Sequence, residues 1–509
     1  MSRSVSRRRS DRTVVALLAG VVLLAPLGWL WARSLVPDTY SVMGMGHADH
    51  GGGPAASHQA HAFGWDGPPP QPGDVPVSDL TGPRDGRPDV EVTLVARQET
   101  VTLPTGEVVG GYTLDHASPG PLIRARQGDL VQVTLVNESV RDGTTLHWHG
   151  VDVPNAEDGV AGITQDAVAP GEEHVYRFVV EDPGTYWYHA HQVSHEQVRQ
   201  GLFGVLVVEP PPAEDEDVLE DVLEVVAPIH TYGGLLTVDG ATGERRVDAD
   251  AGTSVRVRVV NTDDGPLAAQ VVGADYRVLA VDGRDVVGPT PLSGTSLQVP
   301  AGGRADLAFD VPVDGSAARV QLGAGGTAVV VGPAGAPAPP EVAPGAELDL
   351  LSYGSPAPLG FDPAAADRRF EYSIGRRPGF VDGRPGLHWS INGHLFPDVP
   401  MYVVEEGDLV RMTVENHSGQ LHPMHLHGHH AVVLSRDGVP ASGSPWWVDS
   451  LDVASGDSYE IAFVADNPGI WADHCHKLAH AAEGLVAHLA YEGISTPFRI
   501  GGSAGNEPE

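Results

Sequence analysis

Histidines at short, recurring spacings are the residues of this chain best suited to metal chemistry. Ten of the 24 histidines lie in four clusters: His147-Trp148-His149, His189-Ala190-His191, His422-Pro423-Met424-His425-Leu426-His427, and His474-Cys475-His476 with His480 four residues on. Residues i and i+2 of a strand point to the same face, so each His-x-His pair can aim two imidazoles at one place. Neutral imidazole suits copper, zinc and iron. Four such pairs therefore predict a metal centre built from eight imidazoles.

The single cysteine narrows the choice of metal. Cys475 is the only cysteine, so the chain can form no internal disulfide. One thiolate and two imidazoles in a trigonal arrangement, with a weak axial group, are typical of an electron-transfer copper site. Cys475 and His480 come from one loop, and His422 can supply the second imidazole from a neighbouring strand. Structural zinc would explain the histidines but not a thiolate placed between two of them.

An axial methionine often lies ten residues past the cysteine of such a site. Here that position is Leu485, which cannot coordinate a metal. We therefore expect a three-coordinate copper with a raised reduction potential.

The elements that position these residues recur three times along the chain. Glycine and asparagine lie nine residues apart in each copy: Gly128 and Asn137, Gly252 and Asn261, Gly407 and Asn416. Apolar residues alternate between these landmarks, which indicates strands with one face on a core. The 63 glycines and 43 prolines fit many short strands joined by turns. The sequence therefore predicts three β-rich units, each a sandwich or barrel.

All four histidine clusters fall in the first and last units. The middle unit has only the isolated His230, so we expect it to carry no metal. We expect His195, His429 and His430 to be packed or exposed polar residues rather than ligands. Because one chain supplies the whole ligand set, a monomer is sufficient.

The first 36 residues predict export from the cytoplasm. Five arginines lie near the start of the chain: Arg3, Arg7, Arg8, Arg9 and Arg12. An apolar run from Val14 to Ala32 follows, and its length favours an uncleaved membrane anchor over a secretory signal. The positive-inside rule leaves the basic tip in the cytoplasm and the rest of the chain outside. Cleavage after residues 32–34, and hence secretion, is the alternative.

Residues 37–86 are rich in Gly, Pro, Ala and His and predict a disordered stalk. The segment contains six possible metal ligands: Met43, Met45, His47, His50, His58 and His61. It is either a flexible spacer or a weak metal-capturing tail.

The overall charge excludes one class of partner. The 509 residues carry a formal net charge of -36, which repels the phosphate backbone of nucleic acids and attracts cations.

At these clusters the chain resembles the three-domain multicopper oxidases, the family of laccases, bacterial cuprous oxidases and spore-coat laccase. The resemblance covers roughly residues 88–497. Further matching motifs are Asp158-Gly159, Thr164-Gln165, Gly201-Leu202 with Gly204, and Asp466-Asn467-Pro468-Gly469 with Trp471. It implies an all-β fold of three cupredoxin-like Greek-key sandwich or barrel domains, at 87–210, 215–350 and 366–497, preceded by the anchor or signal helix and the stalk.

The resemblance also implies four copper ions and a role for each ligand. Type 1 copper would bind His422, Cys475 and His480; type 2 copper His147 and His425; and the type 3 pair His149, His189, His191, His427, His474 and His476. Asp158 matches a family acid near the oxygen site and would relay protons, although an Asp-Gly pair also occurs in plain turns. A second family acid often follows the last type 1 histidine, and here that position is Ala481.

The expected reaction is one-electron oxidation of a phenolic or other small reductant, coupled to reduction of dioxygen to water. A cuprous oxidase is the alternative, favoured by the acidic surface and the Met/His segment. A non-enzymatic structural cupredoxin would lack several ligands, yet none is missing. A copper nitrite reductase would have two domains and no histidine pair around its cysteine.

Overall fold

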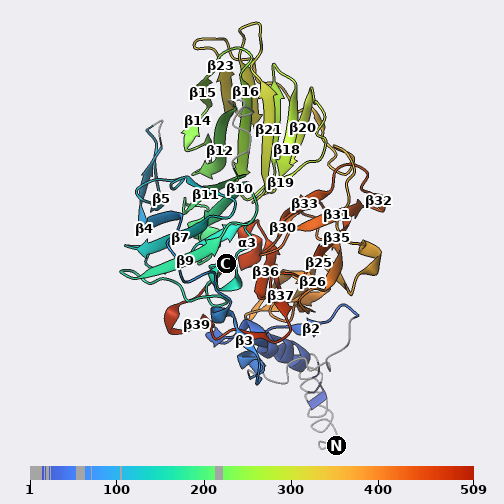
Figure 1. Ribbon diagram of the computed structural model, residues 1–509. Coiled ribbons are helices and arrows are strands. Elements are labelled where there is room, and N and C mark those ends of the chain that lie inside the picture. Colours follow the sequence, from blue (N-terminus) through green and yellow to red (C-terminus); the bar gives the residue numbers. More distant parts are fainter. Residues whose placement is uncertain are drawn as a thin grey trace, which may run out of the picture.

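The computed structural model describes residues 14–15, 18, 22, 24–52, 64–69, 71–103, 106–211 and 222–509. The chain is mostly β and folds into three cupredoxin-like domains, each a pair of sheets around its own core. We name them domain 1 (87–210), domain 2 (222–350) and domain 3 (366–497). Figure 1 shows domain 2 above the other two, with domains 1 and 3 side by side beneath it.

One three-strand unit recurs in every domain. Its central strands are β7 (Leu130–Asn137), β16 (Ser254–Asn261) and β29 (Leu409–Asn416). Each has a parallel neighbour, which is β4 (Val90–Thr102), β12 (Leu223–Tyr232) or β25 (Arg368–Val381). Each also has an antiparallel neighbour, which is β9 (Glu173–Val179), β21 (Arg304–Asp310) or β35 (Ser458–Val464).

The asparagine that ends each central strand explains the repeated spacing. Its side-chain amide donates to a main-chain carbonyl: Asn137 to Val168, Asn261 to Val299 and Asn416 to Val453. These buried bonds satisfy a main-chain carbonyl group of the corresponding turn in all three domains. The predicted threefold repeat is confirmed by this shared pairing.

Domain 1 has two four-stranded sheets around Val133, Trp148 and Tyr176. Their orders are β5 (Val108–Leu114), β4, β7, β9; and β6 (Ile123–Arg126), β11 (Phe203–Glu209), β10 (Gly184–His189), β8 (His147–His149).

Domain 2 has a seven-stranded and a six-stranded sheet around Val257, Leu307 and Val320. Their orders are β14 (Ala241–Thr242), β13 (Leu235–Val238), β12, β16, β21, β18 (Tyr276–Val281), β19 (Arg284–Asp285); and β15 (Glu244–Asp248), β23 (Ala328–Gly332), β22 (Ala318–Leu322), β17 (Leu267–Val272), β20 (Thr295–Val299), β24 (Ala346–Glu347).

Domain 3 packs its two sheets around Tyr372, Phe463 and Trp471. Their orders are β27 (His394–Leu395), β26 (Arg384–Ile391), β25, β29, β35, β31 (Ala431–Arg436), β32 (Val439–Pro440), with β33 (Trp446–Val448) on β31; and β2 (His47–Asp49), β28 (Pro400–Val404), β37 (Val486–Tyr491), β36 (Ile470–Cys475), β30 (His422–Leu426), β34 (Ser450–Val453).

Short helices connect the strands. They are α2 (Ser194–Gln197), α3 (Leu478–Ala482), and the 3-10 turns η1 (Val42–Gly44), η2 (Gly64–Asp66), η3 (Val77–Asp79), η4 (Asn155–Glu157), η6 (Pro363–Ala365) and η7 (Gly502–Ala504).

The prediction of a disordered stalk is wrong for the described residues of 37–86. Three strands in this segment pair with the body: β1 (Thr39–Tyr40) with β39 (Ile500–Gly501), β2 with β28, and β3 (Val75–Pro76) with β38 (Ile494–Ser495). Tyr40, Val42, Met45 and Val77 are buried in one apolar cluster. The few apolar residues between the glycines and prolines are enough to hold this segment on the body, because each extended piece also pairs with a free strand edge. His58 and His61 lie outside the described residues.

The start of the chain is described only in part. Residues 1–13, with the five arginines, lie outside the described residues, and residues 24–33 are helical. Within the described residues, no helix combines the length and apolar character needed to cross a membrane.

Candidate metal centre

Four strands carry the four histidine clusters to the junction of domains 1 and 3. In domain 1, β8 pairs with β10, which sets His147 opposite His189. In domain 3, β30 pairs with β36, which sets His425 opposite His474. β8 holds both histidines of its pair, whereas β10, β30 and β36 hold the first histidine of theirs, and the second follows just past the strand end, at His191, His427 and His476.

Eight imidazoles from these clusters gather into three groups, two of which share His149. The groups are His147, His149 and His425; His149, His189 and His476; and His191, His427 and His474. Within each group one nitrogen per ring lies within 4.8 Å of the others. The closest pairs are His147 Nε2 to His425 Nε2 at 3.4 Å and His427 Nε2 to His474 Nε2 at 3.2 Å. Each group draws on both domains, so the centre exists only where the domains meet.

Several ring nitrogens in this centre have no hydrogen-bond partner. His189 Nε2 and both nitrogens of His191 and His476 are buried without a hydrogen-bond partner. Burial, with His147 among the neighbouring imidazoles, lowers the pKa of His474 to about 3. Burial likewise lowers the pKa of His191 to about 3. Neutral, buried rings with unused lone pairs fit copper ions, which bind imidazole in this form.

A second, smaller group contains the cysteine. His422 Nδ1 lies 3.5 Å and His480 Nδ1 3.8 Å from Cys475 Sγ, and the two nitrogens are 3.1 Å apart. Metal bonds to nitrogen and sulfur of about 2.0–2.3 Å suit one ion among three atoms at these separations. Burial raises the pKa of the Cys475 thiol, so an ion bound there must displace its proton. This set fits a trigonal electron-transfer copper site.

Trp389 covers the two imidazoles of this group. Its ring centroid lies 4.5 Å from that of His480 and 4.9 Å from that of His422. The indole Nε1 donates to Glu483 at 2.7 Å, which fixes the ring. Leu485 is fully buried, and its main chain bonds to both ligands of the loop: its carbonyl accepts from the Cys475 amide and its amide donates to His480.

Asp158 contacts two imidazoles from different domains. Its carboxylate lies 3.0 Å from His147 Nδ1 and 3.2 Å from His427 Nδ1. Burial raises the pKa of Asp158, although His147 acts in the opposite direction. The neighbouring Gly159 has φ +77°, and a Cβ there would lie 1.8 Å from the Leu146 carbonyl oxygen. Asp158-Gly159 is therefore both a tight turn and part of the centre.

The motif search missed Asp449 and Arg304. Asp449 Oδ1 lies 3.2 Å from His149 Nε2, and its carbonyl accepts from His425 Nδ1 at 2.9 Å. Both carboxylate oxygens also accept from the Arg304 guanidinium. Burial alone would raise the pKa of Asp449, but Arg304 holds it well below the usual value. Neither residue lies at a recurring spacing, so no sequence signal marked them.

Glu509 was also missed. Its Oε1 lies 3.7 Å from His474 Nδ1, and its Oε2 accepts from Ser194 Oγ at 3.3 Å. Burial raises the pKa of Glu509, with His191 opposing. The position where the family often has an acid is the buried Ala481. Here a carboxylate reaches the centre from a distant segment, whose end lies between domains 1 and 3 in Figure 1.

His429 and His430 are packed side chains, as predicted. His429 Nε2 lies 2.7 Å from the Tyr491 hydroxyl. His430 lies 3.3 Å from Asp152 and from Asp449. Burial opposes a proton on His430, but the carboxylates outweigh it and raise its pKa to about 9. In domain 2, both nitrogens of His230 are hydrogen-bonded, to Thr262 and to the Arg199 carbonyl.

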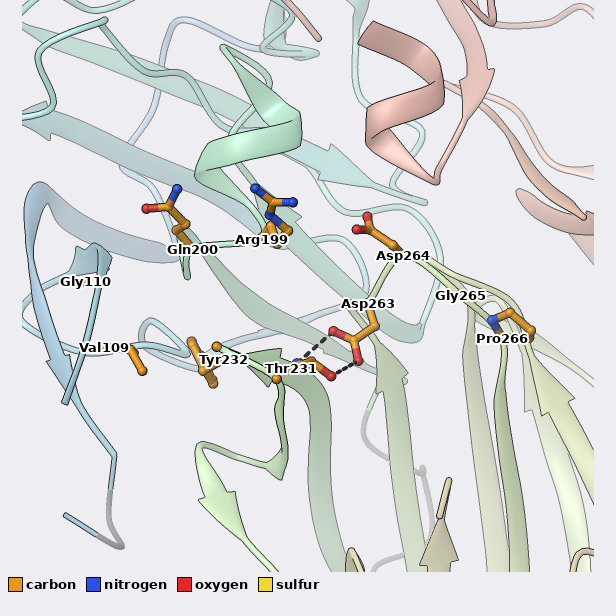
Figure 2. Close-up of a pocket in the computed structure, with 12 residues that line it drawn as sticks. Val109, Gly110, Arg199, Gln200, Thr231, Tyr232, Asp263, Asp264, Gly265 and Pro266 are labelled. Atoms are coloured by element: carbon orange, nitrogen blue, oxygen red, sulfur yellow. Dashed lines mark hydrogen bonds between the residues drawn. The ribbon is translucent and has the colours of Figure 1, made fainter. Parts of the chain in front are cut away.

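A cavity of about 730 Å³ opens between domains 1 and 2. Figure 2 shows Arg199 and Gln200 on one side and Asp263 and Asp264 on the other. Asp263 accepts from the amide and hydroxyl of Thr231 at 2.7 and 2.6 Å. Asp264 accepts from the main chain of Leu478, the first residue of α3. This bond satisfies a free N–H at the start of the helix that carries His480.

Two family models match the chain, both described as multicopper oxidase, over residues 96–213 and 369–493. A multicopper oxidase of Mycobacterium tuberculosis, MmcO, is 28% identical over 479 residues, covering 82% of this chain and 90% of the relative. Laccase-1 of Botryotinia fuckeliana is 28% identical over 443 residues, covering 72% and 76%. The crystal structure of a multicopper oxidase from Pseudomonas thermotolerans superposes with a TM-score of 0.64 at 28% identity, covering 79% and 98%.

Proposed function

The chain belongs to the multicopper oxidase family, and we propose that it couples one-electron oxidation of a phenolic or other small reductant to four-electron reduction of dioxygen to water. One observation carries the proposal. The group of Cys475 and two imidazoles is joined, through a single tripeptide, to two of the three imidazole groups. Copper ions bound by these groups would supply the redox chemistry, because copper can accept and pass on single electrons.

We assign His422, Cys475 and His480 to type 1 copper. His147 and His425 are assigned to type 2 copper, and His149, His189, His191, His427, His474 and His476 to the type 3 pair. The unpartnered ring nitrogens and the short distances between Nε2 atoms support this division. His149 is a member of two of the groups. Its Nε2 is paired with Asp449, whereas its Nδ1 has no hydrogen-bond partner and is the nitrogen available to a metal ion.

Cys475 gives the chain a covalent link between its two kinds of site. Its neighbours His474 and His476 belong to different imidazole groups. A reductant that binds to domain 3 near Trp389 can therefore deliver electrons without access to the buried histidines. Separation of the two sites also keeps the reductant away from dioxygen.

Two carboxyl groups can supply the protons that dioxygen reduction consumes. Asp158 lies at His147 and His427, and Glu509 lies at His474. Burial raises the pKa of both carboxyls, which favours the proton-bearing form. In Glu509→Gln, oxygen uptake should slow. The reductant should still bleach the blue absorption band of the type 1 site, near 600 nm, at the wild-type rate when oxygen is absent. Glu507→Gln, in the same segment, is the control.

Cuprous ion is the competing reductant. The net charge of -36 favours a cation. Against this, Met45 is buried and Met43 packs against the same cluster, so neither thioether is free to capture an ion at the surface. Oxygen uptake with a phenol and no added copper, compared with uptake on cuprous ion, separates the two. A phenol rate below one hundredth of the cuprous rate would overturn the organic-reductant proposal.

We propose that the protein acts outside the cytoplasm, held by its N-terminal helix or secreted, and as a monomer. The arginine-rich start, the apolar run and the complete ligand set in one chain support this. Fractionation of cells that express the full chain tests the location, and light scattering tests the mass. Activity confined to the cytoplasmic fraction would contradict the first point.

A further inference from the structure

Three potential metal ligands from separate segments meet at the edge of domain 3, outside the groups assigned above. His47 begins β2, His394 begins β27, and Asp398 lies in the loop before β28. One ligand atom of each lies within 4.8 Å of the other two. The rings of His47 and His394 are 4.5 Å apart, and His394 Nδ1 lies 3.5 Å from Asp398 Oδ2.

Backbone geometry places both imidazoles. Gly46 has φ +58°, and a Cβ there would lie 1.7 Å from the Val399 carbonyl oxygen, so only glycine allows β2 to approach β28 this closely. That approach sets His47 opposite Pro400. On the other side, Asn392 and Gly393 have positive φ and form the two-residue turn that starts β27 at His394.

The state and orientation of His47 suit a metal ligand. Burial, and then the neighbouring His394, lower the pKa of His47, so its ring is held neutral. The ring also hydrogen-bonds the main chain of Asp398. Imidazoles that bind metals commonly use their second nitrogen in this way, which fixes the ring.

An ion can reach these side chains from solvent. The side chains of His394 and Asp398 are 41% and 51% exposed. Both line a cavity of about 550 Å³ that also includes Gly46, the neighbour of His47. Arg377 lines the same cavity, and its guanidinium donates to the Gly393 carbonyl. The acidic surface as a whole draws cations towards the protein.

We propose that His47, His394 and Asp398 bind a divalent first-row transition-metal ion, Zn²⁺ or Cu²⁺. Two imidazoles with one carboxylate suit these ions, whereas cuprous ion prefers thiolate and thioether. Metal–ligand bonds of about 2.0–2.2 Å require the three ligand atoms to lie somewhat closer together than the 4.8 Å within which they are found. Rotation of the side chains can bring them closer. The bound ion ties the N-terminal segment to domain 3. This site is independent of the oxidase function proposed above.

Zinc binding to the copper-loaded protein tests the proposal, because Zn²⁺ is redox-inert. The reference protein carries His58→Ala and His61→Ala, which removes two of the other three histidines of this segment; the third, His50, lies 3.5 Å from Glu492 and is kept in every variant. We expect calorimetry to show one Zn²⁺ site in the reference. His47→Ala and His394→Ala should each weaken it at least tenfold, and Asp398→Asn should weaken it several-fold. His116→Ala is the matched control, since that exposed histidine pairs with Glu99 but has no second imidazole.

Anomalous diffraction from zinc-soaked crystals locates the ion without any substitution. A zinc peak between the three side chains supports the proposal. The proposal is overturned if the reference binds no Zn²⁺ at micromolar concentration, if the peak lies elsewhere, or if His47→Ala and His394→Ala bind as tightly as the reference.

Discussion

The guanidinium of Arg304 in domain 2 donates two parallel hydrogen bonds to the carboxylate of Asp449 in domain 3, 145 residues further along the chain. Both side chains are buried, at 0% and 1% exposure. Asp449 in turn contacts His149 of domain 1. The middle domain, whose one histidine is already hydrogen-bonded, therefore helps to orient the metal centre. Its role there is positional, through Arg304 and through Asp282, whose carboxylate accepts from the main-chain amides of Asp449 and Ser450.

Arg304→Lys should weaken this centre selectively. Lysine keeps the charge but cannot make the paired bonds, so Asp449 is free to rotate away from His149. We expect metal affinity and oxygen uptake to fall about 10–100-fold, while the blue absorption near 600 nm remains. Copper analysis and oxygen uptake measure the two effects. Arg319→Lys, at a buried arginine of domain 2 that pairs with the exposed Glu244, is the control; equal losses in both variants would contradict the positional role.

Asp158→Asn should slow the oxygen half of the reaction. Asparagine preserves the shape but holds no transferable proton, so we expect turnover to fall about 10²–10⁴-fold. Anaerobic bleaching of the blue band by the reductant should keep its wild-type rate. Stopped-flow absorbance with oxygen uptake separates the two halves, and Asp158→Glu should recover part of the loss. Equal slowing of both halves in Asp158→Asn would argue against a proton role.

Leu485→Met should lower the reduction potential of the type 1 site. Methionine has nearly the volume of leucine, so the core should tolerate it, and its thioether can supply the missing axial group. Redox titration of the band near 600 nm measures the change. An unchanged or higher potential would mean that residue 485 does not face the ion.

The buried carboxyl group of Asp452 should make the stability of the folded protein depend on pH. Burial, then Asp282 and Glu347, raise its pKa from 3.8 to about 7. The folded state therefore holds a proton that the unfolded state has lost between about pH 4 and pH 7, so stability falls as pH rises through this window. Asp452→Asn removes the effect and should be more stable than wild type at pH 8, by on the order of 2–4 kcal/mol.

Thermal midpoints of both proteins at pH 5 and pH 8 check this prediction. The advantage of Asp452→Asn should be clearly smaller at pH 5, where wild-type Asp452 is mostly protonated in the folded state. An advantage of the same size at both pH values would contradict the assignment.

The gathering of the histidines was predictable because the relevant rules are local. Two histidines two residues apart on a strand share a face, and the Gly128–Asn137 spacing recurs where the same strand recurs. Asp449, Arg304 and Glu509 obey no such rule, since their contacts depend on how three domains pack. The N-terminal segment was mispredicted because Tyr40 and Val42 are too sparse for a local pattern, yet they reach free edges and a shared apolar cluster.

Copper content, absorption and oxygen uptake of the purified, copper-loaded protein test the central claim together. The account predicts four coppers per chain, an intense band near 600 nm that Cys475→Ser abolishes, and oxygen uptake upon addition of a reductant. Far fewer than four coppers, no band near 600 nm, and no oxygen consumption would contradict it.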